Sequence, residues 1–183
     1  MKRLPAPLSE RRFMNLTFVK ASDEHANAVW TMRSLVAAFL ELQHGNGHWS
    51  SEPSESGVLN AVHTSYVLVA FEGSKLVGTL RLLTKKPWAI DASFFTPVER
   101  PLYLVDMAVA PGSQRKGVGR ALLKEANRIA AAWPANAIWL DAYDSLAGAG
   151  GFYASCGFSE VGHKEYKGTP LVYFEKPVVP PAK

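Results

Sequence analysis

One stretch of the sequence constrains the fold more than any other: an apolar strand that passes through a tight loop into a helix. The strand is predicted over residues 102–109, and its loop carries Pro111 and Gly112. From Gly117 onward, apolar residues recur at helical spacing until Pro134 ends the pattern. Because further strands and helices alternate after this unit, the sequence predicts a mixed α/β sheet with some parallel pairing.

The rest of the chain supplies the other elements of that sheet. Two apolar, β-branched runs meet at Gly73-Ser74, which is typical of an antiparallel hairpin. Gly78, inside the second run, indicates a bulge or a close approach of another part of the chain. The other predicted strands cover residues 13–20, 66–72, 75–83, 137–142, 157–166 and 171–176, and the other predicted helices cover 22–42, 55–63 and 147–156.

Length and charge predict one domain with short extensions. The chain has 183 residues, of which 48% are hydrophobic, and this is enough for one sizeable core. We expect a basic leader at residues 1–12, one domain at 13–176 and a Pro-rich tail at 177–183. Basic side chains outnumber acidic ones only within the first 20 residues, so the formal net charge of +4 belongs to that segment. A body that is neutral overall does not favour a nucleic-acid partner.

Three further features bear on location and metals. The sequence has no apolar run of the ~20 residues that a membrane helix needs. Its basic start is not followed by the apolar segment of a secretory signal. Cys156 is the single cysteine. We therefore expect a cytoplasmic protein with no membrane association, no disulfide and no metal site.

The start of the helix after residue 117 has the chemistry of an anion site. A helix N-terminus offers unpaired N–H groups and a positive dipole end, and glycines let a phosphate approach them. Arg115, Lys116 and Arg120 add positive charge there. The alternative is a basic, flexible loop that only begins a helix. The glycine spacing matches neither the P-loop nor the G-x-G-x-x-G pattern, so nucleotide hydrolysis and dinucleotide binding lose support.

Two blocks of residues resemble one known family. Gln114, Gly117 and Gly119 fit the pattern Q/R-x-x-G-x-G/A, which is similar to the acyl-CoA-binding motif of the GNAT superfamily of N-acetyltransferases. Residues 152–158 resemble the F-Y-x-x-x-G-F segment of the same family. The resemblance implies a single-domain α/β (α+β) fold whose mixed sheet is mostly antiparallel and flanked by helices. Its central parallel strands, here 102–109 and 137–142, would splay apart to receive the pantetheine of acetyl-CoA.

The resemblance also implies which residues bind acetyl-CoA. The loop amides would hold the pyrophosphate, and a backbone N–H freed by a bulge in the central strand would bind the thioester oxygen. Asp144 stands where the family often has an asparagine that contacts the pantetheine; its alternative role is to cap the following helix. The predicted cofactor-binding residues are Met107, Ala108, Val109, Gln114, Arg115, Lys116, Gly117, Val118, Gly119, Arg120 and Asp144.

Two residues are predicted to act in catalysis. Tyr153 occupies the family's tyrosine position and would protonate the leaving thiolate; the alternative is a packed aromatic side chain. Asp106 is the only carboxylate in the central strand, and alternation places it on the face opposite Val105 and Met107. It is a candidate for the base that deprotonates the amine, or for the charge that binds it. The alternative is a structural aspartate bonded to neighbouring backbone.

The acceptor remains the open part of the expected function. Residues 44–49 and the aromatic excursion at 88–95 lie where relatives place their acceptor pocket, and their aromatics would suit a partly apolar amine, or else fill core under long loops. We expect direct transfer of an acetyl group from acetyl-CoA to a small-molecule amine. The alternatives are a peptide or protein amine, or a CoA-binding sensor or interaction module without turnover. Dimers are common among relatives, so a homodimer is expected by analogy alone.

Overall fold

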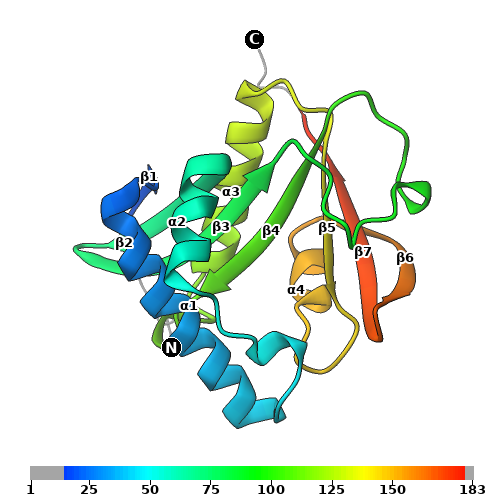
Figure 1. Cartoon of the computed structure of the whole chain (residues 1–183). Helices are drawn as coiled ribbons and strands as arrows, with labels where there is room; N and C mark the ends of the chain where they lie inside the picture. The colour runs from blue at the N-terminus through cyan, green and yellow to red at the C-terminus, as the bar shows by residue number, and fades with distance from the viewer. Residues whose placement is uncertain (1–14, 180–183) are drawn as a thin grey trace, which may run out of the picture.

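The computed structural model describes residues 15–179, which form a mixed seven-stranded sheet with helices on both faces (Figure 1). The strand order is β1-β2-β3-β4-β5-β7-β6, and only the β4–β5 pair is parallel. This arrangement confirms the predicted fold class. The basic leader, residues 13–14 of the first predicted strand and residues 180–183 of the tail lie outside the described residues.

The element bounds follow the sequence pattern closely, and the hairpin at Gly73-Ser74 forms as predicted. The last helix is shorter than predicted because it begins only after Ala149, whereas the first helix runs two residues longer. The strands are β1 (Leu16–Lys20), β2 (Tyr66–Glu72), β3 (Lys75–Leu83), β4 (Pro101–Val109), β5 (Ala137–Tyr143), β6 (Ser159–Tyr166) and β7 (Thr169–Pro177). The helices are α1 (Asp23–His44), α2 (Glu55–Thr64), α3 (Val118–Ala132) and α4 (Gly150–Ser155), with short 3₁₀ turns η1 (His48–Ser50), η2 (Ala92–Phe94) and η3 (Pro111–Ser113).

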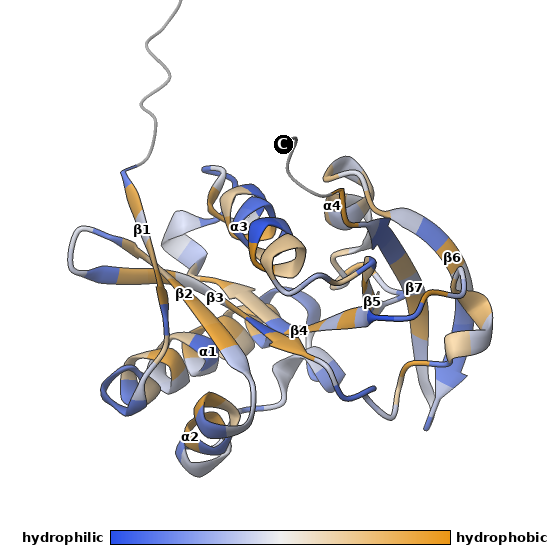
Figure 2. Cartoon of the chain, turned by 90° about the horizontal axis from the view of Figure 1, so that it is seen from above, coloured by the Kyte–Doolittle hydropathy of each residue, from blue (hydrophilic) through white to orange (hydrophobic). Residues whose placement is uncertain are grey.

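The two faces of the sheet are covered differently. Helix α3 packs on one face and α1 and α2 on the other, as the view along the sheet shows (Figure 2). The apolar stripe of α3, which includes Leu122 and Ala126, is fully buried against the sheet. Gly78 of β3 makes this contact possible, since a Cβ there would lie 2.8 Å from Leu122 Cδ1. The close approach predicted at Gly78 is therefore confirmed.

The parallel pair β4–β5 is joined over only three residues of each strand. Residues 101–103 pair with residues 137–139, and beyond that point the two strands separate. A bulge lies in β4 on the separated part: Arg81 and Thr79 of β3 face Val105 and Ala108, so two residues of β4 stand opposite one of β3. Asp106 adopts a positive φ of 54° in this bulge, which interrupts the regular alternation of β4. The chain thus opens the sheet at its centre.

None of the helices within residues 15–179 is both long and apolar enough to span a membrane.

Candidate active site

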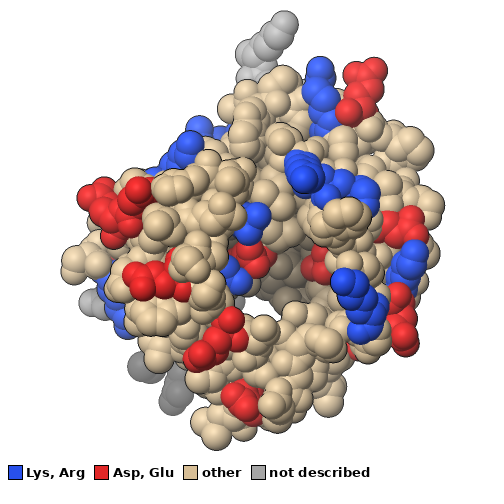
Figure 3. Space-filling view, viewed as in Figure 1, with Lys and Arg blue, Asp and Glu red and all other residues tan. Residues whose placement is uncertain are grey.

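A cleft of about 540 Å³ opens where β4 and β5 separate. Its walls come from α1, the segment after it, the bulged part of β4, the end of β5 and the start of α4. Figure 3 shows it as a hollow at the centre of this face, with acidic and basic side chains together on its walls. Elements far apart in the sequence meet in this cleft, and concave sites of this kind are where small molecules usually bind.

The loop before α3 presents unpaired backbone donors. Within residues 15–179, the backbone N–H groups of residues 115–120 have no protein acceptor, and no side chain caps α3. Gln114 donates from Nε2 to the carbonyl of Val109 at 3.1 Å, which ties the loop to the end of β4. Lys116 and Arg120 hold carbonyls of Gly112 and Ser155 respectively. Free N–H groups with three basic side chains around them fit an anion such as a pyrophosphate.

The two motif glycines serve different purposes. Gly117 precedes α3 with a φ of +94°, a conformation that side chains rarely adopt, and nothing lies within 4 Å of a Cβ placed on it. At Gly119 a Cβ would stand 2.9 Å from the Phe152 ring. Val118, between them, is buried in the core and contributes only its backbone to the helix end. Gly117 therefore shapes the loop, whereas Gly119 lets α3 pack against α4.

Tyr153 lies at the buried base of the cleft. Its side chain is 7% exposed and its hydroxyl faces the sulfur of Met107 at 3.7 Å. Burial, followed by the nearby charges of Asp141 and Cys156, raises the pKa of Tyr153 well above the ordinary value of a phenol. The hydroxyl is thus held protonated, and it can donate a hydrogen bond or a proton into the cleft. Met107 and Ala108 line the cleft beside it.

Asp106 is fixed by two arginines. Arg33 of α1 and Arg81 of β3 each donate to one of its carboxylate oxygens at 3.0 Å. Because of the bulge, all of residues 104–108 line the cleft. The predicted placement of Asp106 on the face opposite Val105 and Met107 is therefore wrong at this point. Asp106 lines the cleft, and each of its two carboxylate oxygens accepts a hydrogen bond from a guanidinium group. Neighbouring side chains, not neighbouring backbone, hold it.

Asp141 is the cleft residue that sequence reasoning missed. It follows the buried Leu140 on β5 and lines the cleft opposite the β4 bulge. Burial, and to a smaller extent the charge of Asp106, raises the pKa of Asp141. In the sequence it resembles any polar residue at a strand end, and only the separation of β4 from β5 places it in a cleft.

The segment after α1 closes the front of the cleft. His48 and Trp49 lie against the ring of Tyr143, with ring centroids 6.5 and 6.1 Å away, and the Tyr143 hydroxyl donates to the His48 carbonyl at 3.1 Å. Both residues line the cleft, as predicted for the loop at residues 44–49. Residues 48–53, called the strap from here on, thus bridge the end of α1 and the end of β5.

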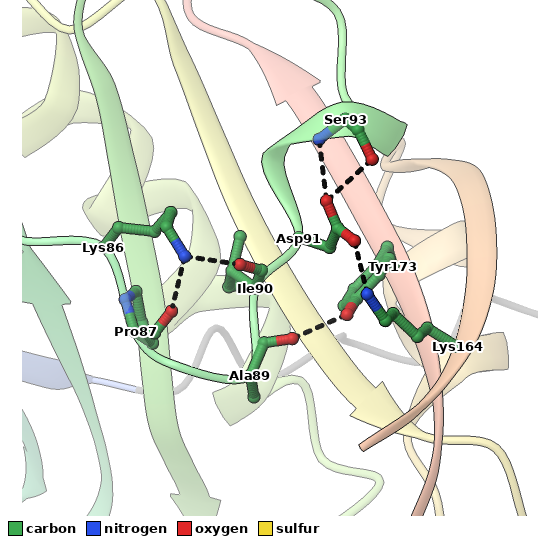
Figure 4. A network of polar contacts seen from close by, with 8 residues as sticks. All are labelled: Lys86, Pro87, Ala89, Ile90, Asp91, Ser93, Lys164 and Tyr173. Carbon is green, nitrogen blue, oxygen red and sulfur yellow. Dashed lines mark hydrogen bonds and ion pairs between the residues drawn. The ribbon is translucent and has the colours of Figure 1, made fainter.

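The aromatic excursion at residues 88–95 does not line this cleft, and of its two expected roles the structure shows the filling of core. Phe95 stacks on Trp139 with ring centroids 4.4 Å apart, and Ile90 is buried beside them, so these side chains fill core on the face that α1 and α2 leave uncovered. The backbone is tied down by Lys164 on Asp91 and by Tyr173 on the Ala89 carbonyl (Figure 4).

Asp144 lies outside the cleft. Its carboxylate pairs with His163 at 2.8 Å, and it lines a separate hollow of about 250 Å³ beside the glycine-rich segment. The hydrogen bond to Asp144, with a second to Glu160, raises the pKa of His163. The alternative role of Asp144 as a helix cap is also wrong, because α4 begins after Ala149 without a side-chain cap. The geometry thus gives no support to a pantetheine contact at Asp144.

Known proteins share both a sequence profile and a fold with this chain. Residues 31–158 match the sequence profile of the acetyltransferase (GNAT) family. Among curated protein sequences no significant match is found.

Solved structures share the fold at low sequence identity. The ribosomal-protein-S18-alanine N-acetyltransferase from Escherichia coli has 18% identity and a TM-score of 0.65, over 89% of this chain and 94% of that one. PaiA N-acetyltransferase from Thermoplasma acidophilum in complex with coenzyme A has 19% identity and a TM-score of 0.68, over 90% and 99%. The structure of yncA from Salmonella typhimurium with its cofactor acetyl-CoA has 16% identity and a TM-score of 0.65, over 90% and 94%.

Proposed function

The chain belongs to the acetyltransferase (GNAT) family, and from that premise we propose that it transfers the acetyl group of acetyl-CoA directly to a primary amine of a small molecule. The observation that carries the proposal is the cleft between β4 and β5, whose β4 wall continues along the chain into the loop before α3. Its volume of about 540 Å³ falls within the range of roughly 300–1,000 Å³ that is usual for small-molecule sites.

The fit to acetyl-CoA is supported by the start of α3. The unpaired N–H groups of residues 115–120 and the side chains of Arg115, Lys116 and Arg120 offer hydrogen bonds and charge to a pyrophosphate. From there the bulged strand β4 leads to Tyr153 at the base of the cleft. When bound, the thioester supplies an acetyl group on a leaving thiol. Met107, Ala108, Val109 and Gln114 are the remaining residues proposed to line its path.

Two groups of the chain are proposed to act on the thioester. The bulge leaves Asp106 and Met107 without register partners in β3, so a backbone N–H at this point can stabilise the negative charge that builds on the carbonyl oxygen. Tyr153 is proposed to give its proton to the departing sulfur, because its hydroxyl is buried, protonated and directed to the same end of the cleft. Asp106 keeps Arg33 in place on the opposite wall.

The strap at residues 48–53 favours a small acceptor over a protein. A protein substrate, like the one in the name of the Escherichia coli neighbour, must feed an extended chain end into the cleft. Here His48 and Trp49 bridge from α1 to Tyr143 across the front. The same side chains, with Leu40 of α1, give the acceptor space aromatic and aliphatic walls, which suit a partly apolar amine.

The proposal is tested by acetyl transfer with purified protein. Acetyl-CoA is combined with 2-phenylethylamine, other primary alkyl amines or short peptides with a free N-terminus, and both free thiol and acetylated product are measured. We expect thiol release with small amines that equals the N-acetyl product formed. Faster acetylation of the peptides would show that the acceptor is a peptide or protein amine and not a small molecule. Binding of CoA without transfer to any amine would instead indicate a sensor.

A further inference from the structure

Three charged side chains meet at the bulge of β4, and their charges do not cancel. Asp106 accepts one hydrogen bond from Arg33 and one from Arg81, each at 3.0 Å. Both guanidinium groups stay charged at any physiological pH, so two positive charges share a single carboxylate. Among the ion pairs formed by residues 15–179, one positive charge of this group is therefore left without a counter-charge.

The group is partly shielded from water. The side chains of Arg33, Arg81 and Asp106 are 24%, 26% and 31% exposed. Behind them, a small cavity is lined mostly by valine and alanine side chains of α1, α2 and β2. Arg81 Nε is buried and has no acceptor in the described part of the chain. Because a charge interacts more strongly in such surroundings than in water, the excess positive charge favours the binding of an anion.

Arg33 is the arginine that such an anion can reach. Arg33 lines the cleft, whereas Arg81 does not. Its bond to Asp106 uses Nη2, and within residues 15–179 its guanidinium group has no other acceptor. A guanidinium group carries several N–H donors in a planar fork that matches a carboxylate. Arg33 can therefore bind a carboxylate that enters the cleft and keep its bond to Asp106.

This position is close to the place where acetyl transfer is proposed. Asp106, which is bonded to Arg33, is followed in the bulge by Met107, and the Met107 sulfur lies 3.7 Å from the Tyr153 hydroxyl. A carboxylate on Arg33 is thus expected near the amine that attacks the thioester. An α-amino acid has this arrangement, because its amine and its carboxylate are attached to the same carbon.

The neighbouring walls suit an apolar side chain. Val36, Ala37 and Leu40 follow Arg33 on the same face of α1 and line the cleft. Leu40 lies about two helical turns from Arg33, so these walls extend for roughly 10 Å along the helix. Trp49 of the strap closes the space beyond them. The length is sufficient for an aromatic or long aliphatic side chain.

The other charges of the cleft are those that a zwitterion needs. Glu52 of the strap and Asp141 of β5 line the cleft, and neither forms an ion pair with Arg33 or Arg81. The cleft thus has a positive position at Arg33 and negative positions elsewhere on its walls. A plain alkyl amine is a cation only, and it would leave the excess charge at Arg33 unpaired.

Resting on the function proposed above, we propose that the acceptor is an apolar α-amino acid whose carboxylate binds to Arg33. Asp106 orients the Arg33 guanidinium group, and Arg81 balances the charge of Asp106, so that Arg33 keeps its attraction for a second carboxylate. Arg33 determines which amines are accepted and takes no part in bond making.

The test compares two acceptors that differ only at the carboxylate, L-phenylalanine and L-phenylalaninamide. The amide has the less basic amine, so a preference for the acid cannot come from a larger share of neutral amine. In the wild type we expect kcat/KM at pH 7 to be at least about tenfold higher with L-phenylalanine, as is usual for a hydrogen bond between charged groups.

Substitution of Arg33 should remove this preference. For Arg33→Gln we expect kcat/KM to fall by about ten- to 100-fold with L-phenylalanine and by less than about threefold with L-phenylalaninamide. A merely structural role of Arg33 would lower both rates alike. Arg128→Gln, which changes an exposed arginine of α3 outside the cleft, is the matched control and should alter neither rate.

Binding of two unreactive analogues provides a readout that does not need turnover. Neither 3-phenylpropanoate nor 3-phenylpropanamide has an amine, and only the first has a carboxylate. By calorimetry in the presence of CoA, the wild type should bind 3-phenylpropanoate at least about tenfold more tightly than the amide, and Arg33→Gln should bind the two equally. Thermal unfolding shows whether each variant is folded, and the wild-type comparisons decide the matter even where Arg33→Gln does not fold.

The outcomes separate this inference from the proposed function. Equal kcat/KM of the wild type with the acid and the amide, or equal losses with both in folded Arg33→Gln, would overturn the carboxylate site while acetyl transfer to amines stands. If no amine is acetylated but 3-phenylpropanoate binds through Arg33, the proposed function fails and the carboxylate site is retained.

Discussion

Tyr153 shows how one buried residue can be held ready for a reaction. Its hydroxyl lies beside a thioether, which is a weak acceptor, and burial keeps the phenol neutral. An interior tyrosine normally finds a stronger partner for its hydroxyl. The proton of Tyr153 is therefore available to a group that arrives in the cleft, and this is the property that an acid needs.

Replacing Tyr153 by phenylalanine removes the proton and keeps the ring in the core. We expect kcat of Tyr153→Phe to fall by roughly 10² to 10³, which is typical for the loss of a general acid. CoA affinity, measured by calorimetry, should change by less than about threefold, because the pyrophosphate is proposed to bind at the loop of residues 114–120, away from Tyr153. A full rate in this variant would assign Tyr153 to packing alone.

Gly117 is constrained by its backbone. Valine at this position would have to adopt a φ near +94°, which costs roughly 1–2 kcal/mol, or else rotate the N–H groups away from the anion. We therefore expect Gly117→Val to weaken CoA binding by about five- to thirtyfold, since 1.4 kcal/mol corresponds to tenfold.

Gly112 provides the matched control for this substitution. A Cβ on it also meets nothing within 4 Å, and its φ is not positive. Gly112→Val should keep CoA affinity close to the wild type. Equal affinities of the two variants would argue against the loop as the pyrophosphate site.

Sequence alone singled out Gly117 and Tyr153 as candidates because each has a fixed place in a motif. It did not identify Asp141, whose exposure to the cleft depends on the point at which β4 and β5 stop pairing. It also could not show that the Asp106 carboxylate forms ion pairs with two arginines, because Arg33 and Arg81 belong to elements that are distant from Asp106 in the sequence. Local patterns report on local conformation, and ion pairs between distant elements follow from the fold.

At the scale of elements, residues 84–100 between β3 and β4 form a cover that packs on the sheet and is attached to it by polar contacts. Its aromatic residues fill the space over β5 and β7, and polar contacts at Asp91 and Thr96 attach it to β6 and β7. The sequence showed an irregular segment rich in aromatics. Which face of the sheet those side chains cover is decided by where α1 and α2 end, so the segment could not be assigned from its own residues.

The Asp91 contact makes this cover sensitive to acid. Hydrogen bonds from Lys164 and Ser93 lower the pKa of Asp91 in the folded protein, so its carboxylate stabilises the fold above the unfolded-state pKa of ~3.9. That contribution is lost as the pH falls further. We expect Asp91→Asn to lower Tm at pH 7, and we expect the difference from the wild type to shrink as the pH falls below ~3.9, with part of it still present at pH 2.5 because the folded-state pKa lies well below the unfolded-state one.

Thermal unfolding of both proteins from pH 7 down to pH 2.5 checks this expectation, with Glu165→Gln as a carboxylate control on β6. A difference between wild type and Asp91→Asn that stays constant over this range would show that the Asp91 carboxylate has an ordinary pKa.

At the scale of the whole molecule, the open sheet links the elements that carry the proposed CoA-binding loop and the proposed acid Tyr153. The bulge in β4 and the early end of β4–β5 pairing create the cleft. The same β4 leads into the loop and α3, and β5 leads toward α4 with Tyr153. The type of each element and the order of the elements along the chain could be predicted from periodicity and turn residues, whereas the splayed central pair was implied only by the family resemblance. The division into leader, domain and tail, and a homodimer, stay predictions.

The central claim is that the cleft and the loop at residues 114–120 form one acetyl-CoA site, and ligand-dependent thermal unfolding tests it most directly. Acetyl-CoA, CoA and ATP are titrated in parallel against the wild-type protein. A ligand at 100 times its Kd adds about 2.7 kcal/mol, so acetyl-CoA and CoA should each raise Tm by roughly 5–10 °C, and ATP should not. An equal rise with ATP would reduce the site to a general nucleotide phosphate site, and no rise with either CoA species would contradict the account.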